Sequence, residues 1–438
     1  MDLLRERPAK LFGRYLLPST SATLVTSIYI IADTVMIGRG VGAEALVALN
    51  LILPLFAVLF AFGMLFGVGG GVQYSVAQGA GDEKRAREAF SSALVCVAAA
   101  AAVLTVLCTL LLRPLCFALG ADGNNIEMVL EYGAWIAHFA PVFLFSSFLQ
   151  AFVRNDRDPR RAMAAVLSGA VVNIVLDYIL IFWCHMGLTG GAVATVIGNG
   201  LTVLILLTHF LSRDNRIRFS RSAVSPGMAA RIASCGAPSF LIEAAAGIVT
   251  FSFNRQLLRY IGRSGVVIYS VIANCALVCM SLFNGVSQAA QPILAANYGG
   301  GLTARVLEVR RMGIVTVLLF GVALASAAYW MPETLIALFV EPTPALTAQG
   351  VPVLRIYFPA FLPMGLNLFL SAYFQSVVRP TPSLVITVLR GVALPILLVV
   401  VLPLLFGGQA IWTAVLLGEL LTLAVALFLL RRHSLTGK

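Results

Sequence analysis

Residues 89–112, AFSSALVCVAAAAAVLTVLCTLLL, form a run of 24 positions without a charged side chain. A helix needs about 20 residues to cross the hydrocarbon core of a bilayer, so this run is long enough to span it once. Residues 312–332 form a second uncharged run of the same kind. The two runs predict a chain threaded through a membrane.

The composition of the whole chain agrees with a membrane protein. Of 438 residues, 60% are hydrophobic and 11% are charged, whereas soluble chains carry roughly 45–50% apolar and about 25% charged residues. These few polar side chains would not cover a water-exposed surface, which excludes a soluble enzyme, a disordered scaffold and a secreted disulfide module. The net charge of +11 comes mainly from arginines between apolar segments, so we expect them to face the membrane surface rather than nucleic acid.

The apolar segments predict an all-α polytopic membrane protein with twelve transmembrane helices. Residues 45–81 and 264–304 are uncharged but too long for one upright span, so each is expected to combine a long helix with a glycine-rich interfacial end. The predicted spans begin near residues 11, 45, 89, 126, 161, 188, 229, 266, 312, 350, 384 and 409.

The basic residues between the spans predict the orientation. With the N-terminus in the cytoplasm, 23 of the 30 basic residues fall on the cytoplasmic side, as the positive-inside rule requires. We therefore expect a multi-pass membrane protein with both termini in the cytoplasm.

The sequence repeats itself with an offset near 220 residues, half its length. Pro18-Ser19 recurs as Pro238-Ser239. Further pairs in the same order are Gly38 with Gly262, Asn50 with Asn274, Gln73 with Gln291, Gly79 with Gly299, and Pro159 with Pro380. Because each half holds six spans, an even number, both halves enter the bilayer in the same direction, as a parallel repeat.

The repeat predicts two pseudo-symmetric six-helix bundles. We expect an N-terminal lobe at residues 1–211, a linker at 212–228 and a C-terminal lobe at 229–438. Two similar bundles around a central seam are what alternating access requires, because a substrate at the midplane can be exposed to either side. Channels more often repeat across subunits than within one chain, so the repeat favours a transporter.

Acidic residues inside the predicted spans are candidates for function, because a charge at the bilayer centre costs about 2.5–3.5 kcal/mol on insertion scales. Asp33 lies in the first span, Asp177 in the fifth and Glu243 in the seventh. Asn173 lies one turn before Asp177, and Tyr29 lies one turn before Asp33, so each pair shares a helix face.

If the first, fifth and sixth spans converge, these residues and Thr195 form an oxygen-rich site in the N-terminal half. Such a site suits a hard cation such as Na⁺, and two neighbouring carboxylates can alternatively hold a proton between them. At the repeat offset Asp33 corresponds to Phe253 and Asp177 to Leu398, so the ion chemistry is expected in one half. A solvated Asp33 near the outer end of its helix is the structural alternative.

Polar residues of the second half are candidates for a substrate cavity. We expect Glu243, Gln291 and Asn274 to face it. Glu419, in the twelfth span, is a fourth acid, and Arg390 could pair with it structurally.

We expect no cofactor beyond a coupling ion. The four histidines show no metal-ligand spacing, and the run Gly69-Gly70-Gly71 lacks the Lys-Ser/Thr of a nucleotide-binding loop.

Several motifs resemble those of the MATE (multidrug and toxic compound extrusion) transporters. The motifs are IADTVMIG at residues 31–38, QGAGD at 78–82, FVRND at 152–156, NIVLD at 173–177, GGAVAT at 190–195, QP at 291–292 and NYG at 297–299. The likeness covers essentially the whole chain in order, and the FVRND segment looks like that of bacterial MepA-type multidrug exporters.

The resemblance implies export of cationic amphipathic compounds, driven by Na⁺ or H⁺, through a cavity between two six-helix lobes. In members with acids in the N-terminal lobe, the first, fifth and sixth helices build the coupling site. The residues that match that site are Asp33, Asn173, Asp177 and Thr195, with Tyr29 at a nearby aromatic position. Other members carry an acid on the tenth helix, whereas residues 356–378 contain none, which puts a coupling site in the C-terminal lobe in doubt. Glu243 looks like the seventh-helix acid of some members.

The expected partners are cationic amphipathic drugs and the lipid bilayer, with the chain acting as a monomer in the bacterial inner membrane. A flippase for a lipid-linked or other amphipathic substrate shares this architecture. Flippases for anionic head groups are expected to carry several arginines in the cavity, and here mid-span arginine is nearly absent, with Arg390 the best candidate. A membrane enzyme would need paired catalytic groups, which the sequence does not offer, and a non-transporting receptor would leave the repeat unexplained.

Overall fold

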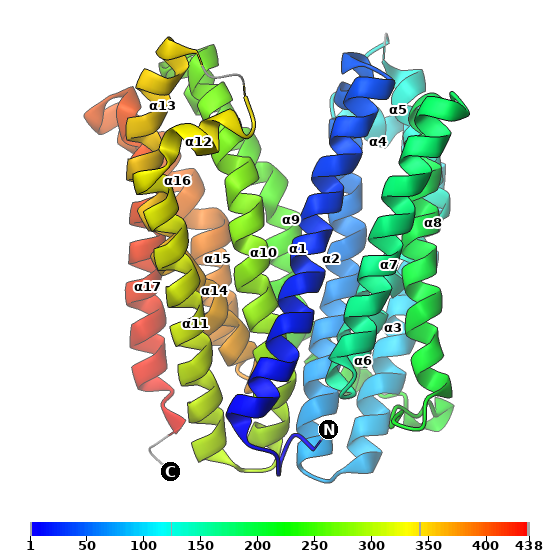
Figure 1. Cartoon of the computed structure of the whole chain (residues 1–438). Coiled ribbons are helices and arrows are strands. Elements are labelled where there is room, and N and C mark those ends of the chain that lie inside the picture. The colour runs from blue at the N-terminus through cyan, green and yellow to red at the C-terminus, as the bar shows by residue number, and fades with distance from the viewer. Residues whose placement is uncertain (1, 124, 341–342, 436–438) are drawn as a thin grey trace.

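The computed structural model describes residues 2–123, 125–340 and 343–435, which form helices joined by turns and contain no strand (Figure 1). The first half comprises α1 (Pro8–Gly40), α2 (Ala43–Gly79), α3 (Glu83–Leu110), α4 (Leu112–Ala118), α5 (Ile126–His138), α6 (Ala140–Asn155), α7 (Pro159–Asp177), η1 (Tyr178–Trp183), α8 (Gly187–Leu207) and η2 (Thr208–Leu211). After η3 (Arg221–Ala223), the second half comprises α9 (Pro226–Tyr260), α10 (Arg263–Gly299), α11 (Thr303–Trp330), α12 (Pro332–Ala337), α13 (Pro344–Tyr357), η4 (Phe358–Ala360), α14 (Phe361–Ser376), α15 (Pro380–Val388), η5 (Leu389–Ala393), α16 (Leu394–Phe406), η6 (Gly408–Thr413) and α17 (Ala414–Arg432).

The described helices confirm the predicted number of spans. Eleven are long and apolar enough to cross a bilayer, and α5 with α6 makes a twelfth that is bent by 51°. The bend falls at Phe139, where Pro141 in the first turn of α6 has no N–H to continue the hydrogen bonds of α5. The third and ninth spans begin earlier than predicted, at Glu83 and Thr303, because each helix starts with a charged turn before its uncharged run.

The surface of the molecule is apolar over most of the length of the helices. Leu110, Phe406 and Leu319 are each more than 60% exposed, which fits contact with lipid and would be unfavourable in water. Trp183 and Trp330 are 73% and 78% exposed at helix ends, where tryptophan is enriched at membrane–water interfaces. The lateral surface is therefore suited to a bilayer.

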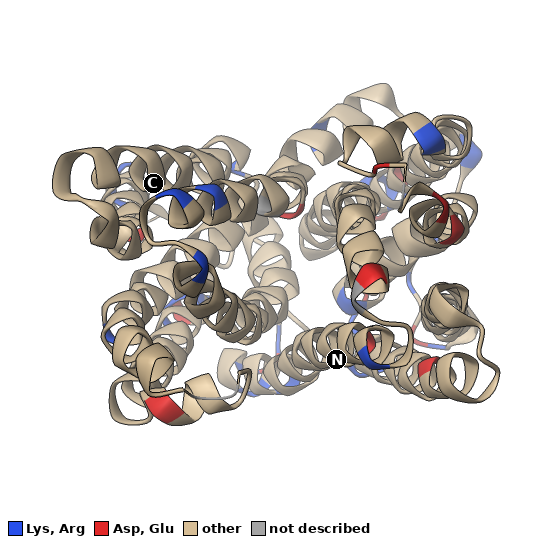
Figure 2. Ribbon diagram, turned by 90° about the horizontal axis from the view of Figure 1, so that it is seen from above, with Lys and Arg blue, Asp and Glu red and all other residues tan. Residues whose placement is uncertain are grey.

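The helices form two bundles that lie side by side, α1–α8 in one and α9–α17 in the other (Figures 1 and 2). Both chain termini lie at the same end of the molecule, and the bundles are farther apart at the opposite end (Figure 1). Helices α1 and α2 of the first bundle contact α10 and α9 of the second, and α2 also contacts α10. These four helices make most of the contact between the lobes.

Paired glycines let the backbones of the two bundles touch near the end that holds the termini. A Cβ atom on Gly79 would lie 1.9 Å from the carbonyl oxygen of Ala296, and one on Gly299 would lie 2.0 Å from that of Val76. Gly79 and Gly299 are repeat partners, as are Val76 and Ala296 at the same offset of 220. The repeat therefore produces a reciprocal contact between α2 and α10 that excludes any side chain larger than hydrogen.

Candidate functional site

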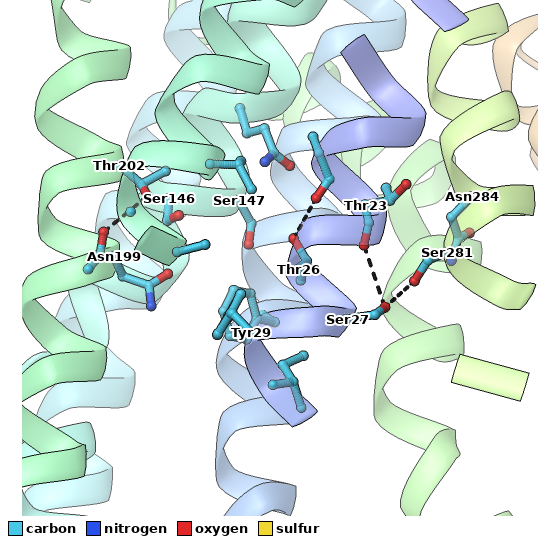
Figure 3. A pocket seen from close by; sticks show the side chains of 18 of the residues that line it. Thr23, Thr26, Ser27, Tyr29, Ser146, Ser147, Asn199, Thr202, Ser281 and Asn284 are labelled. Atoms are coloured by element: carbon cyan, nitrogen blue, oxygen red, sulfur yellow. Dashed lines mark hydrogen bonds between the residues drawn. The ribbon is translucent and has the colours of Figure 1, made fainter. Parts of the chain in front are cut away.

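A cavity of about 310 Å³ lies between the two bundles. Hydroxyl and amide side chains line much of it, and Figure 3 shows them converging from several helices. They are Thr23, Thr26 and Ser27 on α1, Ser146, Ser147 and Gln150 on α6, Asn173 on α7, Asn199 and Thr202 on α8, and Ser281, Asn284 and Gln288 on α10. Apolar side chains complete the wall, among them Phe60, Met64 and Met280. The cavity can therefore hold an amphipathic molecule.

Glu243 is the one charged side chain among the described residues that line this cavity. It lies on α9 and is half-buried, and it also lines a smaller neighbouring cavity together with Gln291. A carboxylate in a largely uncharged, partly dehydrated cavity attracts cations and repels anions. The electrostatics of the cavity therefore favour a cationic ligand.

A second group of polar side chains lies within the first bundle, where Asp33 of α1 meets Asp177 of α7. Their carboxyl groups lie close enough to interact. Asp177 is fully buried, and neither of its oxygens has a hydrogen-bond donor among the described residues; the same holds for Oδ1 of Asp33. Two carboxylates in contact with no donor repel each other, so the site needs a positive charge between them.

Asn173, Thr195 and Tyr132 surround the acid pair. The amide of Asn173 donates to the hydroxyl of Thr195 over 3.4 Å, and the buried Tyr132 of α5 lies close enough to interact with Thr195. The Asn173 carbonyl oxygen is buried without a donor among the described residues. Four unpartnered acceptor oxygens, counting those of Asp33 and Asp177, therefore lie in one part of the bundle.

Local sequence explains how α7 and α8 come close enough to build this group. A Cβ on Gly198 would lie 2.8 Å from the carbonyl oxygen of Gly169, and one on Gly169 would lie 2.1 Å from the hydroxyl of Thr202. After Asp177 the helix widens into the π-helical segment η1, a form that is rare and frequent at functional sites.

Two residues connect the acid pair with the cavity. Tyr29 and Asn173 line the cavity. Tyr29 also lies close enough to interact with Asp33, while Asn173 lies one turn from Asp177. Residues next to the acid pair therefore form part of the cavity wall.

Comparison with known proteins identifies the family. The sequence model of the MatE family matches residues 18–179 and 238–401, one segment in each half of the chain. The chain belongs to the MATE family of transporters.

Relatives agree with membership of the MATE family. A protein of Staphylococcus haemolyticus named multidrug export protein MepA is 25% identical over 423 residues, which are 96% of this chain and 92% of that protein. The Staphylococcus aureus protein of the same name is 25% identical over 429 residues, 96% of this chain and 94% of that protein. A solved structure described as the outward-facing conformation of a multidrug resistance MATE family transporter matches with a TM-score of 0.92, at 23% identity, over 98% of this chain and 96% of that one.

The structure brings together five residues that the MATE motifs single out. Asp33, Asn173, Asp177, Thr195 and Tyr29 lie around one another in the first bundle. Asp33 is not a solvated residue at a helix end, because its carboxyl group faces Asp177.

That Asn274 faces the cavity stays a prediction. Its amide donates to the carbonyl oxygen of Ser270 in its own helix over 2.8 Å, and it is not among the residues that line the cavity. Its repeat partner Asn50 makes the same bond to Leu46, so the two halves share this contact within the helix.

Glu419 belongs to a buried ion pair. Nε of Arg390 lies 3.1 Å from a carboxylate oxygen of Glu419, and the amide of Asn367 donates to the other oxygen over 2.7 Å. Three elements of the second lobe, η5, α17 and α14, are joined at this point. The charge of Arg390 is balanced by Glu419, and Nη2 of Arg390 donates to the sulfur of Met280, a residue of the cavity wall, over 3.5 Å.

Sequence reasoning missed Tyr132 and most of the cavity wall. Tyr132 lies on a short helix without any polar periodicity, so no sequence signal pointed to it. The wall residues did leave a signal: Asn284, Gln288 and Gln291 recur every three to four positions within an uncharged span, which places them on one face of α10.

The donor set of the acid pair fits a monovalent hard cation or a proton. Carboxylate, amide and hydroxyl oxygens are the ligands such cations prefer, and the unpartnered oxygens supply them. Across residues 2–123, 125–340 and 343–435, no group of three His, Cys, Asp or Glu side chains could hold a metal ion. A transition metal is therefore a poor fit for this MATE-family chain.

Proposed function

We propose that the chain exports cationic amphipathic compounds by antiport with H⁺ or Na⁺, through alternating access of the cavity between its lobes. The observation that carries the proposal is the buried Asp33–Asp177 pair with unpartnered oxygens, which shares Tyr29 and Asn173 with the cavity wall. The relatives named multidrug export protein support export of small molecules as the direction of transport.

The cavity supplies the cargo site. Glu243 attracts a cationic group, the hydroxyls and amides accept and donate hydrogen bonds, and Phe60, Met64 and Met280 contact apolar parts. Methionine side chains adapt to differently shaped ligands, which suits a transporter of several compounds. A flippase for anionic head groups is disfavoured, because no basic residue is among the described residues that line the cavity.

The acid pair supplies the ion site. A proton or Na⁺ would be held by Asp33, Asp177, Asn173 and Thr195, and it would cancel the repulsion between the carboxylates. When the ion is absent, the two carboxylates favour separation of α1 from α7. Tyr29, on the same helix as Asp33, would then move with α1 and change the cavity wall.

Coupling requires that ion and cargo prefer different states of the same protein. In this proposal the ion enters from outside, stabilises the close contact of α1 with α7, and weakens the cargo site. After release of the cargo the lobes open toward the cytoplasm, the ion leaves, and a cationic compound binds near the unprotonated acids. The proposal includes an inner-membrane location, both termini in the cytoplasm and a monomeric unit.

The test is efflux of a cationic dye from vesicles that contain the purified protein. We expect Asp33→Asn and Asp177→Asn each to abolish efflux, because each removes a charge that the ion must neutralise, while leaving the amount of folded protein unchanged. Asp214→Asn, at an exposed loop carboxylate, is the matched control and should transport normally. Full efflux by both site variants would refute the proposed ion site.

The same vesicles identify the ion. Efflux is measured after Na⁺ is replaced by a bulky organic cation, and again after the proton gradient is collapsed. The ion whose gradient is needed is the coupling ion, and efflux that survives both treatments would contradict antiport.

A further inference from the structure

A groove of about 620 Å³ lies at the end of the second bundle that holds the C-terminus, between the start of α15 and the end of α17. Its lining includes the basic side chains of Arg379, Arg432 and His433. It also includes the apolar side chains of Val385 and Leu429. The groove therefore joins a basic rim to an apolar wall.

The repeat shows that this place is built differently in the two halves. Pro159 begins α7 and Pro380 begins α15, and at their offset of 221 Asp158 corresponds to Arg379. The Asp158 carboxylate caps α7 by accepting the N–H of Arg161 over 3.1 Å, whereas no side chain caps α15. Pro380 and Pro382 have no N–H, so Thr381 carries the one free N–H among the first three residues of α15. That N–H and the helix dipole favour a negative charge, which α7 has and α15 lacks.

The basic side chains of the groove have no acidic counterpart in the described part of the chain. Arg161 pairs with Asp158 at 3.0 Å in the first bundle. No carboxylate of residues 2–123, 125–340 or 343–435 forms such a pair with Arg379 or Arg432. Arg379 instead donates to the carbonyl oxygen of His433 over 3.1 Å. The rim therefore carries a net positive charge that an external anion would balance.

The apolar wall continues onto the lipid-facing surface of the bundle. Val385 is 37% exposed on α15, and Leu421 and Phe428 are 51% and 60% exposed on α17. A molecule with a phosphate at the rim and hydrocarbon chains along this wall would satisfy both sides of the groove.

We propose that the groove binds an anionic phospholipid, with its phosphate between Arg379 and Arg432 and an acyl chain against Val385 and Leu429. A phosphate oxygen accepts the N–H of Thr381 in the first turn of α15, and the phosphate neutralises the two arginines. Basic pockets between transmembrane helices at the membrane surface bind anionic head groups by the same chemistry. This site is separate from the cavity, and the inference does not depend on drug export.

The experiment compares two neighbouring arginines on α17. The purified full chain is placed in phosphatidylcholine bilayers with and without phosphatidylglycerol; retained lipid is counted by native mass spectrometry, and the melting temperature is measured. We expect phosphatidylglycerol to be retained and to raise the melting temperature. Arg432→Gln should weaken retention about fivefold, the effect of roughly 1 kcal/mol for one basic residue near a lipid surface. Arg431→Gln removes the same charge outside the groove and should change neither readout.

A second variant tests the capping argument. Arg379→Asp places a carboxylate before α15, where it can accept the N–H of Thr381. We therefore expect the protein to keep its stability in pure phosphatidylcholine and to lose its response to phosphatidylglycerol. Equal losses in Arg431→Gln and Arg432→Gln would overturn the proposal, since they would reflect general surface charge. If soluble glycerol phosphate raises the melting temperature as much as the lipid does, the lipid is not the occupant. If phosphatidylglycerol raises the melting temperature of Arg379→Asp as much as that of wild type, the proposal is also overturned.

Discussion

The contact between α2 and α10 gives a quantitative prediction about the transport cycle. In Gly299→Ala the new Cβ would lie 2.0 Å from the carbonyl oxygen of Val76, and 2.7 Å and 2.9 Å from two further backbone atoms of that residue. Ordinary contact begins at 3.4 Å, so the two helices must separate by more than 1 Å. The backbone of Val76 is fixed within α2 and cannot turn aside.

The cost of that separation decides the size of the effect. Overpacking a tight interior contact costs typically about 1–3 kcal/mol, which corresponds to roughly a 5- to 150-fold change in an equilibrium between two states. If the lobes alternate, the contact exists only while the end with the termini is closed. Gly299→Ala should therefore shift the population toward the state that is open at that end.

The shift can be measured with spin labels at Lys84 and Ala304, exposed residues at the starts of α3 and α11. The background carries Cys184→Ser, because Cys184 is the exposed cysteine among those described. We expect Gly299→Ala to lengthen the distance distribution. Gly247→Ala, which places a Cβ where nothing lies within 4 Å, should leave it unchanged. An unaltered distribution in a folded Gly299→Ala protein would refute the reasoning that this contact opens during transport.

Further predictions concern the cargo site, the buried ion pair and the Asp158 cap of α7. Glu243→Gln should raise the KM for a cationic dye about tenfold or more, because a charge-assisted contact worth about 1.5–3 kcal/mol is lost. Transport of an uncharged analogue of the dye should not change. An equal rise in KM for both dyes would contradict a role for Glu243 in charge recognition. Arg390→Leu should destabilise the protein by about 3–5 kcal/mol, because it leaves Glu419 buried without its cationic partner. The double variant Arg390→Leu with Glu419→Leu should recover much of that lost stability in thermal unfolding. A double variant no more stable than the single one would contradict this explanation. Asp158→Ala should cost about 1 kcal/mol through loss of the α7 cap. Burial raises the pKa of Asp158, but hydrogen bonds from His209 and a backbone N–H outweigh burial and hold the pKa below its usual value. The stabilisation by Asp158 is therefore complete at neutral pH and is lost as the pH falls through the lowered pKa. The difference in melting temperature between wild type and Asp158→Ala should shrink in acid. A difference that stays constant with pH would contradict this linkage.

The fold was largely predictable from the sequence because each of its main signals is local. An uncharged run of about 20 residues predicts a span wherever it occurs, and the offset near 220 predicts two equivalent halves. The bend between α5 and α6 was not predicted, because the fourth span looks continuous in hydropathy. Helix starts at Glu83 and Thr303 were also missed, since helices extend into the interface beyond their apolar runs.

The sequence by itself determined which acidic side chains stand in predicted membrane spans. Burial of a carboxylate there is costly, so the following residues stand out as candidates: Asp33, Asp177, Glu243 and Glu419. Only the tertiary structure decided what each one meets. Asp33 and Asp177 share one site although 144 positions separate them, whereas Glu419 is paired with Arg390. Periodicity gives the face of a helix on which a residue lies, but the partner of that face depends on how the helices pack, and for α7 and α8 that depends on the close contact at Gly169 and Gly198.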